Sequence, residues 1–206
     1  YGAQIVFCEP TQLARKKTLE KVIQQTKAYF VHPYNDPNVV LGQSSAAWEF
    51  LHEIPELELI ITPVGGGGLL SGSILAAEAF HALNNLPLCK VTAAEPEQAN
   101  DAYRSMQSGS IQSLTDKQIM SPTIADGLRT TIGNIPFHIM RRTHTEIICV
   151  SEESIVKAMR YIWERFNMII EASCAVPIAA LLENKITPTF KTVSYTHLRA
   201  HETELH

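Results

Sequence analysis

The sequence lacks a strong excess of either charge. Its 206 residues include 17 Lys and Arg against 21 Asp and Glu, which gives a formal net charge of −4. Proteins that bind nucleic acids or membrane surfaces normally carry a basic excess, so we expect neither as a partner. Because 45% of the residues are hydrophobic, the chain can bury a sizeable core, and low-complexity disorder is excluded.

Long hydrophobic runs are absent as well. No segment approaches the roughly 20 apolar residues that span a bilayer, and the longest candidate, 57–70, is broken by four glycines. No signal-peptide pattern precedes the first apolar segment, so a cytoplasmic location is expected. The chain starts at Tyr1 rather than at a methionine, which indicates a piece of a longer protein.

Cysteine is scarce and dispersed. The four cysteines are Cys8, Cys89, Cys149 and Cys174. Without a Cys-x-x-Cys pair they predict neither a zinc site nor a disulfide scaffold, and they suit a reducing compartment.

The C-terminal segment 193–206 lacks the apolar periodicity of the preceding chain. It resembles a translated cloning or sequencing adapter, so we expect it to be non-native and base no fold prediction on it. His197 and His201 lie four residues apart in this segment, which leaves a metal-binding tail as the alternative.

Strand-like and helix-like segments alternate along the chain. Strands are expected at 3–9, 28–32, 57–64, 90–94 and 146–150, and helices at 11–27, 42–52, 69–83, from 98 and from 152. This alternation predicts an α/β fold with an open, mostly parallel sheet flanked by helices. A polar loop is expected at 107–125, and the double-proline cluster Pro33–Pro37 is the best candidate for a domain boundary.

The helix expected after Ser151 has the clearest pattern. Ser151 suits the N-cap position, and Glu152 and Glu153 lie in the first turn, where the helix dipole favours negative charge. The apolar residues that share one helical face are Ile155, Ala158, Met159, Ile162, Trp163 and Phe166.

The strongest local signal is a run of four glycines between an apolar strand and an apolar helix. Gly65, Gly66, Gly67 and Gly68 leave the turn without any Cβ, so backbone N–H groups can converge on an anion at the helix N-terminus. Open α/β sheets bind ligands at the carboxyl ends of strands, so phosphate is the expected ligand. Neither a Walker lysine nor the dinucleotide spacing is present, and a flexible turn without a ligand is the alternative.

With its flanks, Thr62–Leu69 (TPVGGGGL), this run resembles the cofactor-phosphate loop of fold-type II pyridoxal-phosphate enzymes. Other matching segments are Tyr1–Pro10 (YGAQIVFCEP), His32–Pro37 (HPYNDP), Ala93–Asp101 (AAEPEQAND), Thr123–Leu128 (TIADGL) and Trp163–Glu171 (WERFNMIIE). The combination is most similar to the serine racemase and serine/threonine dehydratase group, over residues 1–185. The resemblance implies a tryptophan-synthase-β-like fold in which 1–35 end a small domain and 36–192 form most of the large, cofactor-binding domain.

The resemblance also implies residue roles around the cofactor. The N–H groups of the four glycines and of Leu69 would bind its phosphate, Gly127 would lie beside its ring, and Glu171 would lie near the pyridine ring. The segments Gly42–Ser45 (GQSS) and Glu171–Ala175 (EASCA) depart from the family's patterns. The alternatives are a plain turn for Gly127 and a helix N-terminus for Glu171.

A divalent-cation site is implied as well. Glu95, Asp101 and the carbonyl of Ala99 match the metal site of the serine racemase group. Two carboxylates and a backbone oxygen are suitable ligands for Mg²⁺, Ca²⁺ or Mn²⁺. Without the resemblance, carboxylates at this spacing would be interpreted as a solvated face or a helix N-terminal cap, and this alternative stays open.

Two arginines match further functional positions. Arg15 matches a residue that would pair with the substrate carboxylate as a fork, although the basic run Arg15–Lys17 also suits a solvated helix face. Arg165 matches a nucleotide-contacting position, which implies ATP as an effector. An ordinary surface arginine is the alternative for Arg165.

For the intact parent, the resemblance implies a homodimeric racemase or ammonia-lyase acting on serine, threonine or another small 3-hydroxy amino acid. The α-proton is removed, and either reprotonation on the other face or loss of the β-hydroxyl follows, the latter giving a keto acid and ammonia. None of the nine lysines here has the family's context for the Schiff-base lysine. We expect that lysine and the opposite-face serine upstream, and this chain alone to be inactive. A cysteine-synthase-like or tryptophan-synthase-β-like relative and a non-catalytic phosphate-binding module stay open.

Overall fold

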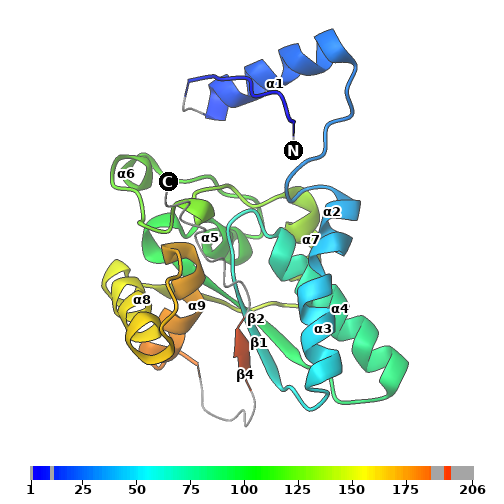
Figure 1. Ribbon diagram of the computed structural model, residues 1–206, viewed down its shortest axis with the longest axis vertical. Coiled ribbons are helices and arrows are strands. Elements are labelled where there is room, and N and C mark those ends of the chain that lie inside the picture. Colours follow the sequence, from blue (N-terminus) through cyan, green and yellow to red (C-terminus); the bar gives the residue numbers. More distant parts are fainter. Residues whose placement is uncertain (1, 10–11, 187–192, 196–206) are drawn as a thin grey trace. The chain divides into compact units, whose positions relative to one another are not determined.

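The chain forms two compact units, residues 1–32 and 33–206 (Figure 1). The computed structural model describes residues 2–9, 12–186 and 193–195. The first unit contains α1 (Gln12–Thr26). Residues 2–9 and 28–32, both expected to be strands, are described without strand structure. A strand needs a partner for its backbone hydrogen bonds, and the described part of this unit supplies none.

The second unit is built on a four-stranded sheet. Its strands are β1 (Leu59–Pro63), β2 (Lys90–Pro96), β3 (Ile147–Val150) and β4 (Val193–Tyr195). Their order is β3-β2-β1-β4, and all neighbouring pairs are parallel. The β1 residues are all buried, as expected for a parallel strand covered on both faces. The predicted α/β fold with an open parallel sheet is confirmed.

Strand β4 lies where no element was predicted. Val193–Tyr195 belong to the segment predicted to be a non-native tail, and they pair with Leu59–Ile61 of β1. The free edge of β1 offers backbone N–H and C=O groups, so even a three-residue strand gains hydrogen bonds there. A run this short shows no periodicity in the sequence. The rest of the predicted non-native tail, with His197 and His201, lies outside the described residues.

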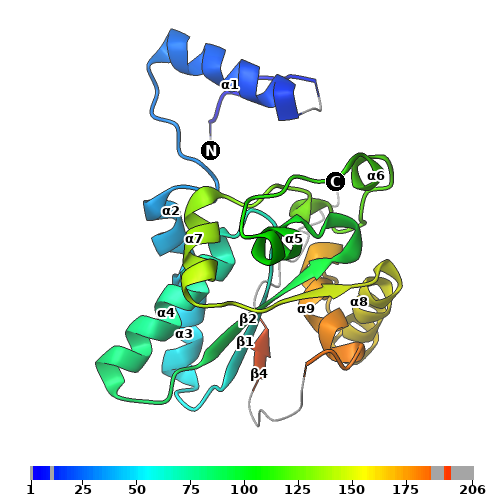
Figure 2. The same cartoon turned by 180° about the vertical axis from the view of Figure 1, so that it is seen from behind.

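Helices cover both faces of the sheet, as Figure 1 and, from behind, Figure 2 show. They are α2 (Pro37–Gln43), α3 (Ser45–Glu53), α4 (Gly68–Asn84), α5 (Asp101–Ser108), α6 (Asp116–Met120), α7 (Asn134–Arg142), α8 (Glu152–Phe166) and α9 (Ala172–Leu182), with the short 3₁₀ helices η1 (Glu97–Ala99) and η2 (Asp126–Leu128). Leu59 and Ile61 of β1 pack with α8 and α9, whereas Ile60 packs with α3 and α4. This alternation follows from the two-residue period of a strand.

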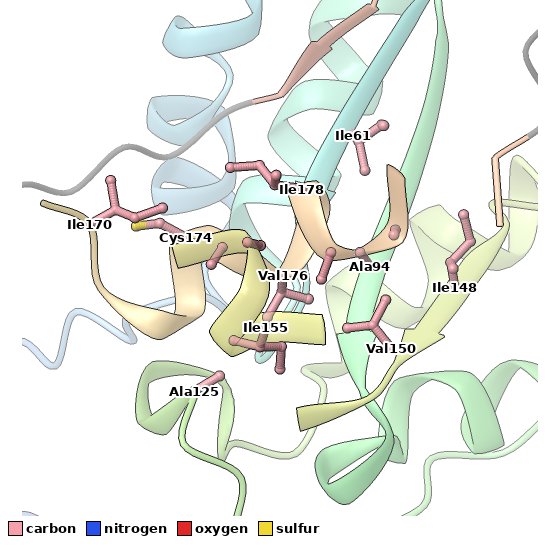
Figure 3. Packing of buried hydrophobic residues seen from close by; sticks show 14 of the residues in the cluster. Ile61, Ala94, Ala125, Ile148, Val150, Ile155, Ile170, Cys174, Val176 and Ile178 are labelled. Carbon is pink, nitrogen blue, oxygen red and sulfur yellow. The ribbon is translucent and has the colours of Figure 1, made fainter. Parts of the chain in front are cut away.

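Figure 3 shows the core on the α8–α9 side. Ile61, Ala94 and Val150 come from the neighbouring strands β1, β2 and β3 and form one apolar cluster with Ile155 of α8 and Val176 of α9. Parallel strands thus present a continuous apolar surface to the helix pair. The packing holds α9 next to the sheet, which positions its N-terminus for the site described below.

The apolar face of α8 is buried only in part. Ile155, Ala158 and Ile162 are buried, but Trp163 is 63% exposed and Phe166 is 54% exposed. The contacts of α8 are mainly with α9 rather than with the sheet. The last apolar residues of the predicted face therefore remain at the surface.

Several helices, among them α6, α7 and α9, lie where no helix was predicted from the sequence. Helix α6 falls within the expected loop 107–125, and its signal is a capping box between Thr115 and Gln118. Helix α7 buries Pro136, Phe137 and Met140 on one side. Pro136 and Phe137 lie four and three positions before Met140, which is a helical pattern. In a helix of only nine residues the pattern repeats too few times to be recognised in the sequence.

Candidate functional site

The glycine run joins the carboxyl end of β1 to the start of α4. Gly67 is the N-cap of α4 and adopts the left-handed conformation, with φ of +89°. Within the described part of the chain, the N–H groups of Gly65 to Leu69 donate no hydrogen bond. Free N–H groups and the positive end of the helix dipole make this turn suited to an anion.

The same glycines also permit close packing around the turn. A Cβ built on Gly66 would overlap the ring of Tyr34, and one on Gly67 would lie 2.6 Å from Pro136 Cβ. A Cβ on Gly65 would lie 3.0 Å from Leu128 Cα. Carbon atoms in contact normally lie about 3.5–4.0 Å apart, so none of the three positions accepts a side chain without movement. The sequence analysis assigned no role to Tyr34, and its only signal was the HPYNDP cluster.

Gly127 lies between the glycine run and the start of α9. Its N–H donates to Ser173 Oγ at 3.2 Å, and its carbonyl oxygen is 3.4 Å from the Cβ position of Gly65. The structure therefore brings Gly127 to the loop, as a cofactor-binding role requires. Glu171 is the N-cap of α9, but its side chain makes no capping hydrogen bond.

The carboxylates of Glu95 and Asp101 form a buried pair at the end of β2. Both residues are fully buried. Glu95 accepts hydrogen bonds from the N–H groups of Ala102 and Tyr103, both at 2.9 Å, so it caps α5. Asp101 Oδ2 accepts from the N–H of Ile132 at 3.1 Å. Asp101 Oδ1 is buried and has no partner among the described residues.

Burial controls the protonation of this pair. It raises the pKa of Asp101 to about 7, against the hydrogen bond from Ile132 and the charge of Arg104. It raises the pKa of Glu95 well above its usual range, and the charge of Asp101 adds to this effect. A negative charge here is costly unless it is compensated.

The carboxylate pair supplies some of the ligands that a hard cation needs. The unpartnered Asp101 Oδ1 is a free acceptor, and each carboxylate oxygen of Glu95 can accept a second interaction. Ala99 lies in η1 between them and is buried. Among the described residues no group of three or more His, Cys, Asp or Glu side chains is gathered, so a cation here would need backbone and water oxygens as well.

The two predicted arginines are exposed. Arg15 lies in α1 of the first unit, and Arg165 lies in the last turn of α8. Their roles toward a substrate and a nucleotide stay predictions.

A comparison with protein-family models decides the family. The model described as pyridoxal-phosphate dependent enzyme matches residues 1–193. The chain belongs to this pyridoxal-phosphate family. The resemblance noted in the sequence is confirmed, and so is the fold type that it implied.

Individual relatives fall in the group that the sequence resembles. The beta-hydroxyaspartate dehydratase of Paracoccus denitrificans (strain Pd 1222) is 40% identical over 184 residues, 89% of this chain and 56% of that protein. The serine racemase of Dictyostelium discoideum is 41% identical over 185 residues, 90% of this chain and 55% of that protein. The chain thus spans about half the length of these relatives.

A solved structure agrees. The crystal structure of the serine racemase from Dictyostelium discoideum superposes with a TM-score of 0.84 at 38% identity, covering 99% of this chain and 63% of that chain. Among the described residues of this chain, no helix is long and apolar enough to cross a membrane.

Proposed function

We propose that the whole protein is a pyridoxal-phosphate-dependent serine racemase or ammonia-lyase acting on serine, threonine or another small 3-hydroxy amino acid. The glycine loop carries this proposal, because its N–H groups donate no hydrogen bond within the described part of the chain and lie at a helix N-terminus. Similarity to a serine racemase and to a beta-hydroxyaspartate dehydratase supports the substrate class. Both names refer to amino acids with a hydroxyl on the β-carbon.

In this proposal the loop holds the cofactor by its phosphate. Hydrogen bonds from N–H groups of Gly65 to Leu69 to phosphate oxygens would be charge-assisted, and the dipole of α4 would add to them. Gly127 and Glu171 would lie beside the cofactor ring. Bound pyridoxal phosphate supplies an electron sink for the negative charge that develops at the substrate α-carbon.

The carboxylate pair is our candidate for a structural cation site. Glu95, Asp101 and the carbonyl of Ala99 would bind Mg²⁺, Ca²⁺ or Mn²⁺ together with water. The free Asp101 Oδ1 supports this assignment, since a cation would satisfy a buried acceptor and offset two buried negative charges.

The remaining assignments concern the whole protein. We propose that Arg15 pairs with the substrate carboxylate, that Arg165 contacts an ATP effector, and that the intact protein is a cytoplasmic homodimer. Residues 1–35 would then end a small domain and 36–192 would belong to the large domain. The family membership supports these assignments.

Ligand binding to this chain tests the loop. Equilibrium dialysis would measure binding of pyridoxal phosphate, competition by inorganic phosphate, and binding of pyridoxal, a matched ligand without the phosphate. We expect saturable binding of pyridoxal phosphate, and inorganic phosphate should compete with it. Pyridoxal should bind with an affinity that is lower by roughly tenfold or more. Equal affinities for the two vitamers would contradict a phosphate site.

The activity is tested on the whole protein. It would be supplied with pyridoxal phosphate and with serine, threonine or 3-hydroxyaspartate, and the opposite enantiomer, the keto acid and ammonia would be measured. We expect turnover of at least one of the three. Turnover of none, with conversion of an O-acetylated serine and sulfide instead, would favour a cysteine-synthase-like enzyme.

A further inference from the structure

Two hydrogen bonds connect the Asp101 carboxylate to the glycine loop through successive residues. The N–H of Ile132 donates to Asp101 Oδ2 at 3.1 Å. The N–H of the next residue, Gly133, donates to the carbonyl of Gly66 at 3.0 Å. One short turn is therefore held at one end by α5 and at the other by the loop. Asp101 is fully buried, so its bond is made away from bulk water, where it is stronger.

The side chain of Ile132 reinforces this connection. It packs in one apolar cluster with Val64, Leu70 and Ala102. Val64 precedes the glycines, Leu70 follows them, and Ala102 follows Asp101 in α5. Because protein interiors are close-packed and transmit displacements, the turn cannot shift without moving the loop or the start of α5.

The loop is confined on its other sides as well. The Cβ position of Gly67 is 2.6 Å from Pro136 Cβ and 3.4 Å from Ile132 Cγ1, and the Tyr34 ring occupies the space beside Gly66. The N–H of Ile135 is bound by Asn35 Oδ1 at 2.9 Å, which ties α7 to the segment that carries Tyr34. The direction of the loop's N–H groups is thus set by its neighbours.

We propose that Asp101 is a positioning residue for the glycine loop. Through Ile132 and Gly133 it fixes the Gly66 peptide, and so it orients the N–H groups that would bind phosphate. The two oxygens of Asp101 differ in their contacts. Oδ2 accepts the hydrogen bond from the N–H of Ile132, whereas Oδ1 has no partner among the described residues. The inference rests on the proposed function of the loop as a phosphate site.

Two variants separate the hydrogen bond from the charge. Asp101→Ala removes the acceptor, whereas Asp101→Asn keeps an amide oxygen that can accept from Ile132. Without divalent cations, we expect Asp101→Ala to weaken binding of inorganic phosphate roughly tenfold, as the loss of one buried hydrogen bond predicts. Asp101→Asn should rescue most of that affinity. Asp116→Ala is the matched control, because Asp116 is an exposed carboxylate at the start of α6.

Amide hydrogen exchange gives a second readout that needs no ligand. The useful probes are the N–H groups of Gly133 and Ser71, which donate to the carbonyls of Gly66 and Gly67. Both should exchange faster in Asp101→Ala than in Asp101→Asn, while amides of β1 and α8 keep the parent's rates and report an intact fold.

The outcomes distinguish the two levels of the proposal. A parent chain that binds no phosphate refutes the proposed phosphate site, and the exchange rates still test the positioning role. Unchanged exchange at Gly133 and Ser71 in Asp101→Ala overturns that role. Equal impairment in the Ala and Asn variants overturns it as well, because the charge and not the hydrogen bond would then matter.

Discussion

A single methyl group separates glycine from alanine, and the structure leaves no room for it at Gly66. The ring of Tyr34 fills the space where the Cβ would lie. The sequence predicts the glycine run as an anion-binding turn, because that property depends on adjacent residues. It does not predict Tyr34, because a contact between separate segments depends on how the chain folds back.

We therefore expect Gly66→Ala to lower the free energy of unfolding by roughly 1–3 kcal/mol, the usual cost of overpacking. Tyr34→Ala should remove much of that additional cost, since the new Cβ then has space. Urea unfolding of the four proteins gives the double-mutant cycle. The control is Gly42→Ala, where no neighbouring atom lies within 4 Å of the Cβ position. The same cost with and without Tyr34 would refute the contact.

The buried carboxylates predict a pH dependence. The folded state holds the proton of Asp101 up to a pKa of about 7, against an ordinary value of 3.8, and the pKa of Glu95 is raised in the same direction. Folding thus binds protons, so stability is greatest below the unfolded pKa and falls as the pH rises through the folded value. In a chelating buffer, we expect Asp101 to account for a loss of up to about 4 kcal/mol across this window.

Unfolding titrations at several pH values measure this loss. Asp101→Asn, which cannot ionise, should flatten the profile. A parent chain whose stability rises between pH 4 and 7 would show that the carboxylates are stabilised in their charged form instead.

A bound cation should offset the loss of stability that ionisation of the buried carboxylates causes at high pH. At pH 8 we expect Mg²⁺ to raise the melting temperature of the parent chain, because a ligand that binds only the folded state stabilises it by mass action. Asp101→Ala should abolish the Mg²⁺-dependent shift, and the surface variant Asp116→Ala should keep it. An equal Mg²⁺-dependent shift of the melting temperature in Asp101→Ala would contradict a cation site at this carboxylate.

Among whole elements, those with local signals could be predicted. The N-cap of α8 is confirmed, since Ser151 Oγ accepts from the N–H of Ser154 at 3.2 Å, and the apolar run of β1 is a buried strand. The expected strand at 3–9 is wrong, and β4 was missed. Strand formation depends on a pairing edge elsewhere in the chain, and no local pattern reports whether that edge exists.

Ser151 joins two elements, so its loss should cost more than a cap alone. Its Oγ also donates to Glu183 Oε1 at 2.7 Å, at the C-terminal end of α9. We expect Ser151→Ala to lower stability by roughly 1–3 kcal/mol, because it removes the cap and the hydrogen bond donated to Glu183. Thermal unfolding would measure it beside Ser110→Ala, an exposed serine. Equal effects of the two substitutions would contradict this account.

At the scale of the whole molecule, topology assembles the candidate site. Parallel pairing places Pro63 of β1 beside Ala94 of β2, so the glycine loop and the Glu95–Asp101 pair emerge at the same edge of the sheet. The resemblance to a family identified both segments separately. That one turn at Ile132 and Gly133 links them could not be predicted, since nothing in the sequence of that turn marks its two partners.

The lysines of this chain bear on whether it can catalyse the reaction by itself. The family chemistry needs a neutral lysine amine beside the cofactor. Ion pairs at the surface hold Lys90 with Glu146 and Lys157 with Glu153. The hydrogen bond to Glu183 raises the pKa of Lys185, which favours its protonated amine. None of the nine lysines has the sequence context of the family's cofactor lysine.

We therefore expect the purified chain to bind pyridoxal phosphate reversibly and to convert no serine. The assay adds cofactor and L-serine and measures D-serine and pyruvate, with the whole protein as the positive control. Borohydride reduction, which fixes a lysine-bound cofactor covalently, should label the whole protein at one site and leave this chain without a specific label. Turnover by the chain together with one labelled lysine would refute the prediction, because that lysine would then be the Schiff-base lysine that we expect upstream of this chain.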